Sequence, residues 1–487
     1  MKSTYFDLIE QSYEFPQEGF DLLDGELTFY GVSISHLIKK YGTPFKLNYL
    51  PRIGDQIKKA KNLFKRSMKS NNYQGKYYYC YCTKCCHFEH VIRKALEYDV
   101  HLETSSAFDV DIIYKLYESG HLDKKIIIVH NGYKTQEYLD RIIQLQSDGF
   151  VNSIVVLDSM SELDRLNQRL DRPINIGIRM AINEEPQSAY YTSRLGIRPE
   201  EILPFYENTI SKMENINLTM MHFFIDTGIK DNLYYWGEFN KAIRLYAALK
   251  KKCSTLQDLN IGGGFPIRNN LGFEFDYKSM VNDIVSAIKE ICVSEEIAEP
   301  NIFTEFGKYT VGESGATIFT VLEEKRQNDT ERWYMIDNSL MNTIPDAWGI
   351  LEKFILLPIN KWDRPFYNVN IGGISCDHSD YYNSEDLNQQ VFLPEFDSEK
   401  DSEPLYVGFF HTGAYQDAIS GYGGIKHCLI PSPKTIVIDR DSTGNYVDYL
   451  FRDEQSSEHM LSILGYSNQS KEAKPDKMGA RRGSRLK

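Results

Sequence analysis

The feature that most constrains the fold of this chain is a series of eight short apolar runs in its first two-thirds, separated by amphipathic stretches. Most of the runs are continuously apolar, as parallel strands buried on both faces are. Between two of them, residues 237–253 place Phe239, Ile243 and Tyr246 at helical spacing. This alternation predicts a (β/α)8 barrel. The predicted strands span 76–81, 99–104, 125–130, 153–158, 175–180, 218–224, 256–261 and 301–306.

Side chains with useful chemistry lie at or just after the carboxyl ends of these runs. Barrel active sites form on the face where the carboxyl ends of the strands meet. Scattered surface charges would have no reason to fall at these positions, so the sequence predicts one active site on that face. The residues are Lys84, Glu103, His130, Asn131, Asp158, Arg179, His222, Phe224, Gly262, Gly263, Gly264 and Glu305.

Beyond about residue 315 the helical periodicity gives way to short strand patterns separated by turn residues. We therefore predict an α/β chain in which a (β/α)8 barrel over 46–315 is followed by an antiparallel β-sandwich or β-barrel domain over 316–465. Residues 1–45 are expected to contribute to the β domain, through a strand at 26–34. The polar and basic segment 466–487 predicts a disordered tail.

Composition narrows the functional classes. The chain has 487 residues and a net charge of −13, which argues against a nucleic-acid partner and suits weak steering of a cationic substrate. No apolar run approaches the length of a membrane span, and the N-terminus lacks the pattern of a signal peptide. We therefore expect a cytoplasmic enzyme with no membrane partner.

Four of the eight cysteines lie within residues 80–86. A zinc cluster is one interpretation, but the spacing C-x-C-x-x-C-C is not typical of zinc sites and no second Cys/His pair is placed to complete it. We favour the other interpretation, in which Cys80 and Cys82 are small apolar strand residues and no metal is bound. Cys253 and Cys292 lie in helical patterns and are predicted to be in the core.

Three strand-end motifs together indicate a cofactor site. Lys84 follows the first strand within Y-C-T-K, where a lone lysine would otherwise be a solvated loop residue. The run Gly262–Gly264 follows the seventh strand, where bare backbone N–H groups can approach a phosphate, although such a run can also be a simple turn. Glu305 ends the eighth strand, and a carboxylate buried there needs a partner.

These motifs resemble those of the alanine-racemase-fold (type III) pyridoxal-phosphate (PLP) decarboxylases, over roughly residues 40–430. The resemblance implies that Lys84 holds the cofactor covalently, that Glu305 contacts its pyridine nitrogen, and that Cys376 donates a proton. It further assigns cofactor contacts to Arg179, Phe224, Thr227, Gly262, Gly263, Gly264, Lys308 and Tyr415. The matching strings are Tyr81-Cys-Thr-Lys84, Ser193-Arg-Leu-Gly196, Asn260-Ile-Gly-Gly-Gly264, Glu305-Phe-Gly-Lys308, Cys376-Asp377 and Gly413-Ala-Tyr415.

Within that family the chain is most similar to the biosynthetic arginine decarboxylases. This similarity implies conversion of L-arginine to agmatine and CO2, with Asp346, Asp377 and Asp380 as substrate-binding carboxylates. It also implies a homodimer with shared active sites, in which the loop carrying Cys376 reaches the partner's barrel. The strings that carry the similarity are IPDAWGI (344–350), CDHSD (376–380), TGAYQ (412–416) and HNGYK (130–134).

The chain departs from the family pattern at three places. Phe224 stands where the family has a histidine that stacks on the cofactor, Asp226-Thr227 replaces Gly-Ser, and Lys308 replaces an arginine and loses its bidentate fork. These changes bear on cofactor affinity more than on reaction type.

Three alternative functions are open on the sequence. The first is a decarboxylase of the same fold that acts on ornithine, diaminopimelate or carboxynorspermidine. The second is a racemase, which would not need the Cys-Asp pair. The third is a non-catalytic regulator of polyamine enzymes, for which loss of Lys84 or Cys376 would be expected; both are present.

Overall fold

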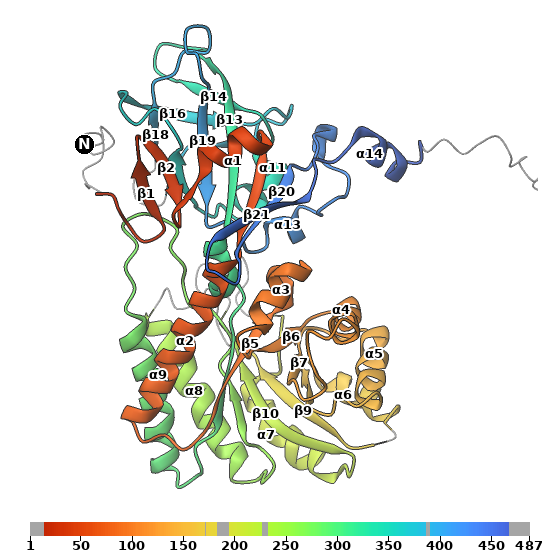
Figure 1. Cartoon of the computed structure of the whole chain (residues 1–487). Helices are drawn as coiled ribbons and strands as arrows, with labels where there is room; N and C mark the ends of the chain where they lie inside the picture. Colours follow the sequence, from red (N-terminus) through yellow and green to blue (C-terminus); the bar gives the residue numbers. More distant parts are fainter. Residues whose placement is uncertain (1–13, 171, 183–193, 226–231, 386–389, 467–487) are drawn as a thin grey trace, which may run out of the picture.

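The computed structural model describes residues 14–170, 172–182, 194–225, 232–385 and 390–466. Two parts lie one above the other in Figure 1: a barrel surrounded by helices, and a β domain. The chain starts in the β domain, forms the barrel, and then returns to the β domain. The long helix α2 (Leu50–Ser70) leads from the first part of the β domain down the side of the barrel.

Eight parallel strands close into a barrel, with β12 pairing to β5 to complete the ring. All eight apolar runs form its strands, so the predicted (β/α)8 barrel is confirmed. The strands are β5 (Tyr77–Cys82), β6 (His101–Thr104), β7 (Ile128–His130), β8 (Ser153–Leu157), β9 (Ile174–Met180), β10 (Ile216–Phe223), β11 (Asp258–Asn260) and β12 (Asn301–Glu305).

The barrel buries side chains on both faces of its strands. Cys80, Val129, Met220 and Phe303 come from four different strands and form a small buried cluster of their own, as inward-facing residues of a closed barrel do. Outward-facing residues pack under the helices in one large core. The six cysteines of the barrel are buried and free: Cys80, Cys82, Cys85, Cys86, Cys253 and Cys292. For Cys80, Cys82, Cys253 and Cys292 this agrees with the predicted positions in strands and core.

Some of the barrel helices start at a capping side chain. The hydroxyl of Ser106 accepts the backbone N–H of Asp109 at the start of α4, and Thr135 does the same for Tyr138 at the start of α5. The other helices around the barrel follow the same strand–helix alternation. They are α3 (Glu89–Leu96), α4 (Ala107–Glu118), α5 (Gln136–Ser147), α6 (Met160–Asn167), α7 (Pro199–Asn208), α8 (Asn232–Lys250) and α9 (Tyr277–Ser294), with short 3-10 turns η2 (Thr83–Cys85) and η3 (Ile210–Lys212).

The β domain is built around β13 (Gly315–Lys325), which pairs with β4 (Phe45–Tyr49), β14 and β19. The sheet was predicted to be antiparallel and is mixed instead, because β4 runs parallel to β20 and β14 runs parallel to β16. Alternation of apolar and polar residues is the same in either direction, so it could not predict strand polarity. The other strands are β14 (Trp333–Ile336), β15 (Ile355–Pro358), β16 (Phe366–Gly372), β17 (Tyr381–Tyr382), β18 (Val391–Pro394), β19 (Leu405–Phe410), β20 (Lys434–Arg440) and β21 (Tyr446–Arg452).

The N-terminal segment reaches the β domain in a different way from the one predicted. The strand expected at 26–34 belongs to a separate three-stranded sheet of β1 (Phe20–Leu23), β2 (Glu26–Phe29) and β3 (Val32–Ser33). That sheet is followed by α1 (Ile34–Tyr41), and the segment then supplies β4 to the main sheet. The exact domain boundaries stay a prediction, and the tail beyond Tyr466 lies outside the described residues.

Short helical segments complete the β domain and its junction with the barrel. The segments are α10 (Lys308–Val311), η4 (Gly312–Ser314), α11 (Leu340–Thr343), α12 (Pro345–Gly349), α13 (Gln416–Ile419), η5 (His427–Leu429) and α14 (Ser457–Ile463).

Among the helices that the structure describes, none combines the length and the apolar character that a membrane crossing requires.

Candidate active site

The carboxylate of Glu305, the last residue of β12, contacts side chains from the ends of three other barrel strands. Its Oε1 accepts hydrogen bonds from Nδ2 of Asn131 (2.8 Å) and Nδ2 of Asn260 (2.6 Å). Its Oε2 lies 3.3 Å from Nε2 of His222, which is 2% exposed on β10. Strand-end position placed Asn131, His222 and Glu305 on one face in the sequence analysis, but only the closed barrel shows that they share one carboxylate.

The surroundings of Glu305 favour its ionised form. Burial alone would raise the pKa of this carboxyl group, yet the charge and proximity of His222, the Lys84 ammonium and the Asn131 amide outweigh that cost. The net effect holds the pKa of Glu305 well below its ordinary value. A carboxylate kept ionised in this way can hold a proton on a basic ring nitrogen placed against it.

Lys84 projects from η2, directly after β5, toward the end of β6. Its Nζ donates to both carboxylate oxygens of Glu103, at 2.9 and 3.0 Å, and Glu103 is fully buried. Burial lowers the pKa of Lys84, but Glu103 outweighs this effect and the net pKa is raised. The sequence placed both residues at strand ends; their pairing was not predicted.

The glycine run after β11 lies in close contact with the strand ends beside it. A Cβ atom on Gly262 would lie 2.7 Å from Cδ2 of Phe224, and one on Gly263 would lie 2.5 Å from the carbonyl oxygen of Glu305. Gly262 and Gly264 also have φ angles of +66° and +98°, which favour glycine. The run is therefore required by this packing, whatever it binds.

Two further residues that were predicted to contact a cofactor border the same mouth. Tyr415 follows β19 in the β domain and donates its backbone N–H to the carbonyl oxygen of Cys85 (2.8 Å), next to Lys84. Lys308 follows Glu305 and forms an ion pair with Glu352 at 2.5 Å. The loop of the β domain thus lies directly against the barrel mouth.

Phe224 and Arg179 lie together at the ends of β10 and β9. The guanidinium carbon of Arg179 is 5.8 Å from the centre of the Phe224 ring. Thr227, the remaining residue predicted to contact a cofactor, lies outside the described residues, as does Ser193.

The three carboxylates predicted to bind substrate differ in their burial and in their hydrogen-bond partners within the chain. Asp346 is buried and accepts Nε2 of Gln416 at 2.8 Å. Asp380 is buried and accepts the backbone N–H groups of Met341 (3.1 Å) and Ser375 (3.2 Å). Asp377 is about one-third exposed and accepts the backbone N–H of Ser379 at 2.8 Å. Asp377 is thus the most accessible of the three.

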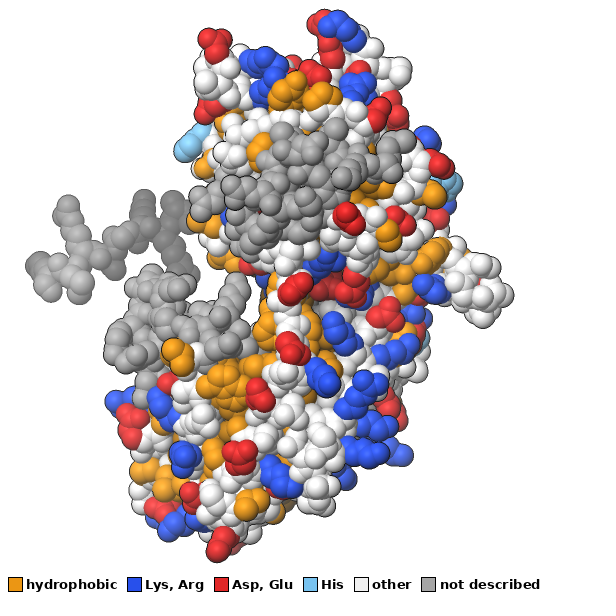
Figure 2. All heavy atoms as spheres, turned by 90° about the vertical axis from the view of Figure 1, so that its left-hand side faces the viewer, with side chains coloured by type: hydrophobic (Ala, Val, Ile, Leu, Met, Phe, Trp, Pro, Cys, Tyr) orange, Lys and Arg blue, Asp and Glu red, His pale blue; other side chains and the backbone are white. Residues whose placement is uncertain are grey.

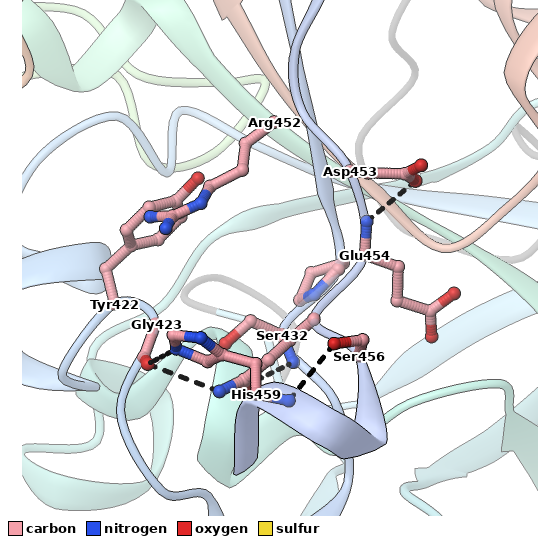
Figure 3. Close-up of a pocket in the computed structure, with 10 residues that line it drawn as sticks. Tyr422, Gly423, Ser432, Arg452, Asp453, Glu454, Ser456 and His459 are labelled. Atoms are coloured by element: carbon pink, nitrogen blue, oxygen red, sulfur yellow. Dashed lines mark hydrogen bonds between the residues drawn. The ribbon is translucent and has the colours of Figure 1, made fainter. Parts of the chain in front are cut away.

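A pocket of about 230 Å³ lies elsewhere, between the end of β21 and α14 (Figure 3). Arg452 lies over the ring of Tyr422 there, and His459 contacts the carbonyl oxygen of Gly423. None of the predicted site residues lines this pocket, so it is separate from the barrel mouth.

Comparison with known proteins agrees with this geometry. Residues 54–312 match a family described as the pyridoxal-binding domain of pyridoxal-dependent decarboxylases. A curated relative, the biosynthetic arginine decarboxylase of Prochlorococcus marinus strain MIT 9215, is 22% identical over 89% of this chain and 84% of its own length.

Solved structures share the fold at low sequence identity. The biosynthetic arginine decarboxylase of Campylobacter jejuni superposes with a TM-score of 0.77 at 20% identity, covering 93% of this chain and 89% of that one. A diaminopimelate decarboxylase of M. jannaschii reaches 0.72 at 19% identity, covering 91% and 97%.

The residues at the barrel mouth fit a PLP group. Within the described part of the chain, three buried polar atoms of the residues that contact Glu305 have no hydrogen-bond partner: Oδ1 of Asn131 and the two ring nitrogens, Nδ1 and Nε2, of His222. Nε2 of His222 makes no hydrogen bond of good geometry, so Oε2 of Glu305 keeps the capacity to accept one from a ring N–H. Lys84 supplies an amine beside it. The family match covers more than half of the chain, and we conclude that this protein belongs to the pyridoxal-dependent decarboxylases, which are carboxy-lyases that use pyridoxal 5′-phosphate.

Proposed function

We propose that this carboxy-lyase converts L-arginine to agmatine and CO2, and that it does so as a homodimer whose two active sites each use residues of both subunits. The observation that carries the reaction is the group of four strand ends around Glu305, with Lys84 and Glu103 beside it. The arginine assignment is supported by the similarity to the arginine decarboxylases and by Asp377.

Each residue of the barrel mouth has one task in this proposal. Lys84 supplies the amine that holds the cofactor, and Glu103 orients that amine. Glu305, kept ionised by His222, Lys84 and Asn131, would hold the proton on the ring nitrogen. The bound cofactor supplies an electron sink for the electron pair left when CO2 departs. Arg179, Phe224, Thr227, Gly262, Gly263, Gly264, Lys308 and Tyr415 would position its ring and phosphate.

The proton that replaces CO2 on Cα is assigned to Cys376. This residue is exposed in the single chain, in the loop that follows β16. Its neighbour Ile374 is also exposed, and Ile350 and Leu351 expose 68% and 72% of their surface. Exposed apolar residues of this domain, of which Ile374 lies two residues from Cys376, favour a subunit interface on it, and a second chain would bring its barrel to Cys376. Figure 2 shows a further band of apolar side chains running from the junction of the two domains over the barrel.

Asp377 is the proposed partner of the guanidinium group. A guanidinium is planar and pairs best with an accessible carboxylate, and Asp377 is the most accessible of the three predicted acids. Asp346 and Asp380 would shape the site from behind through their bonds to Gln416, Met341 and Ser375. A shorter substrate that ends in an ammonium group would leave the Asp377 carboxylate without a partner.

The test is a comparison of amino-acid substrates with the PLP-loaded enzyme, with the amine product identified by mass spectrometry. We expect kcat/KM for arginine to exceed those for ornithine and lysine by about 100-fold, the cost of leaving a desolvated acid unpaired. Asp377→Asn should remove most of this preference, whereas the exposed Asp363→Asn is the matched control and should keep it.

Equal or faster turnover of ornithine, lysine or diaminopimelate would contradict the arginine assignment and leave the decarboxylase chemistry in place. Diaminopimelate is the second candidate substrate, because a diaminopimelate decarboxylase shares the fold with a TM-score of 0.72. Its far end carries an ammonium group beside a second carboxylate, so its site would need a cation for that carboxylate in addition to an acid for the ammonium group.

A further inference from the structure

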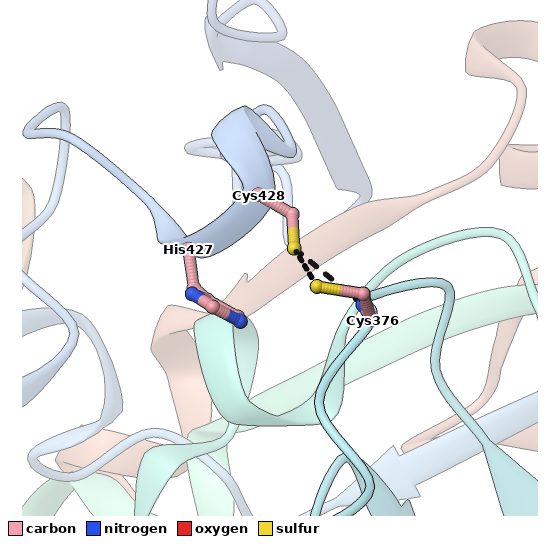
Figure 4. Close-up of side chains that lie close together, drawn as sticks. All are labelled: Cys376, His427 and Cys428. Carbon is pink, nitrogen blue, oxygen red and sulfur yellow. Dashed lines mark hydrogen bonds between the residues drawn. The ribbon is translucent and has the colours of Figure 1, made fainter.

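Among the described residues, one group of thiol and imidazole side chains lies outside the barrel mouth: Cys376, His427 and Cys428 (Figure 4). The possible ligand atoms of the three side chains all lie within 4.8 Å of one another. The two sulfur atoms are 3.2 Å apart, and the backbone N–H of Cys376 points to Sγ of Cys428 at 3.5 Å. These are the two exposed cysteines of the protein; the other six are buried.

We propose that Cys376, His427 and Cys428 form a binding site for a thiophilic divalent cation of the Zn²⁺ class, and that occupation of this site stops decarboxylation. Two thiolates and one imidazole are ligands that Zn²⁺ prefers, and a three-residue set leaves a fourth position for water. A tetrahedral ion needs such ligand atoms about 3.5–3.8 Å apart. Small rotations of the exposed side chains reach that spacing from the present one.

The two loops that carry the ligands are held by the same short helix. Asn342 of α11 donates Nδ2 to the carbonyl oxygen of His427 (3.0 Å) and accepts the His427 backbone N–H (3.2 Å). Asp380 binds the backbone N–H of Met341, also in α11, and that of Ser375, next to Cys376. Both loops are therefore fixed with respect to α11, so the three ligands are held together before any ion binds.

The charge balance also favours a cation. Binding of M²⁺ replaces the two thiol protons, which are released to solvent, and the resulting site of one M²⁺ and two thiolates is neutral. Asp377 follows Cys376 in the chain, and the ammonium group of Lys426, next to His427, donates to the carbonyl oxygens of Ser420 and Gly421.

Binding would compete with catalysis because Cys376 has only one thiol. A thiolate bound to a metal ion has no proton to give to Cα. Substrate must reach Cys376 from solvent, so an ion can reach it too. This inhibitory consequence rests on the proposed role of Cys376 as proton donor; the metal site itself does not.

The binding test uses Co²⁺ as the probe on the reduced, PLP-loaded enzyme. We expect one Co²⁺ per chain, with intense d–d absorption at longer wavelengths than the cofactor and displacement by Zn²⁺. Cys428→Ser and His427→Gln should each weaken binding at least about 10-fold, since even partners outside the ligand set cost that much. The control is His378→Gln, because His378 is 99% exposed beside Asp377 and should leave affinity unchanged.

Weak absorption typical of Co²⁺ bound only by oxygen, or intense bands that survive Cys428→Ser, would overturn the metal site. The metal site would also be overturned if peroxide formed a Cys376–Cys428 disulfide and the reduced protein bound no Co²⁺. The two cysteines would then be a redox pair in which His427 has no part.

The activity test separates the metal site from the role of Cys376. Micromolar Zn²⁺ should inhibit the wild-type enzyme, a chelator should restore it, and Cys428→Ser should be active and resistant to Zn²⁺. Binding of one Co²⁺ at the cluster without any loss of activity would overturn the inhibitory mechanism and, with it, the assignment of Cys376 as proton donor. Absence of binding would overturn the metal site and leave that assignment untouched.

Discussion

At the scale of single residues, the proposed chemistry depends most on the pairing of Lys84 with Glu103 and on the environment of Glu305. Glu103 is fully buried and its two oxygens both accept the Lys84 ammonium, so neither residue is replaced without cost to the other. Removal of the Lys84 cation would leave the Glu103 carboxylate buried without its partner, which is costly. Substitutions at Lys84 therefore have to preserve the cation if they are to report on chemistry alone.

We predict that Lys84→Arg abolishes the covalent attachment of PLP and the decarboxylase activity while the protein stays folded. Arginine keeps a cation against Glu103 but has no nucleophilic amine to bind the cofactor aldehyde. The measurement is borohydride reduction of the PLP-loaded protein followed by peptide mass spectrometry.

The matched control is Lys308→Arg, which keeps the ion pair with Glu352 and should still carry the adduct on Lys84. A reduced adduct on any other lysine of Lys84→Arg would show that Lys84 is not the attachment site.

At the scale of elements, the glycine loop after β11 depends on close contact with the ends of its neighbours. A Cβ atom at Gly263 would meet the carbonyl oxygen of Glu305 at 2.5 Å, and backbone atoms cannot move aside as a flexible side chain can. Any displacement of this loop would also move Glu305, whose own backbone N–H donates to the carbonyl oxygen of Gly262.

We predict that Gly263→Ala weakens PLP binding about 10-fold or more, because the loop has to move away from the β12 end. Absorbance of the bound cofactor during dialysis against PLP-free buffer measures this loss. Gly237→Ala is the control, since it lies in α8 with nothing within 4 Å of the added methyl group. Retention of PLP by both variants alike would show that the loop does not help to hold the cofactor.

At the scale of the whole molecule, the two proposed halves of the chemistry lie in different domains. Lys84 and Glu305 belong to the barrel, and Cys376 belongs to a loop of the β domain that is exposed in the single chain. A homodimer with two-fold symmetry would give each barrel the Cys376 loop of the other subunit.

We predict that mixing Lys84→Arg with Cys376→Ala, each inactive alone, restores about a quarter of wild-type activity. Random exchange makes half of the dimers mixed, and each mixed dimer has one intact site of two. The control is a mixture of Lys84→Arg with Glu305→Gln: both changes lie in the barrel, so no mixed site is intact. Equal recovery in the two mixtures, or none after subunit exchange proven by mass, would contradict shared sites.

The order of the strands and the face that carries the chemistry could be predicted from the sequence, because both depend on local patterns. Apolar runs of strand length alternate with helical periodicity, and barrels place their sites at the carboxyl ends of the strands. Lys84, Glu305 and the run Gly262–Gly264 were found in this way. The direction of the strands in the β domain could not be predicted in this way. β4 pairs with β20, which lies nearly the whole chain away in sequence, and a local pattern does not record the direction of a distant partner.

What the sequence by itself determined is thus the barrel and the end of it at which the candidate active-site residues lie. Only the tertiary structure decided which side chains are in contact. It brings His222, Asn131 and Asn260 to the carboxylate of Glu305, and it places Cys428 beside Cys376, although the two cysteines are 52 residues apart in the chain. The physical reason is that side-chain contacts form between segments far apart in the chain, and their partners are selected by chain closure and packing, which no local pattern encodes.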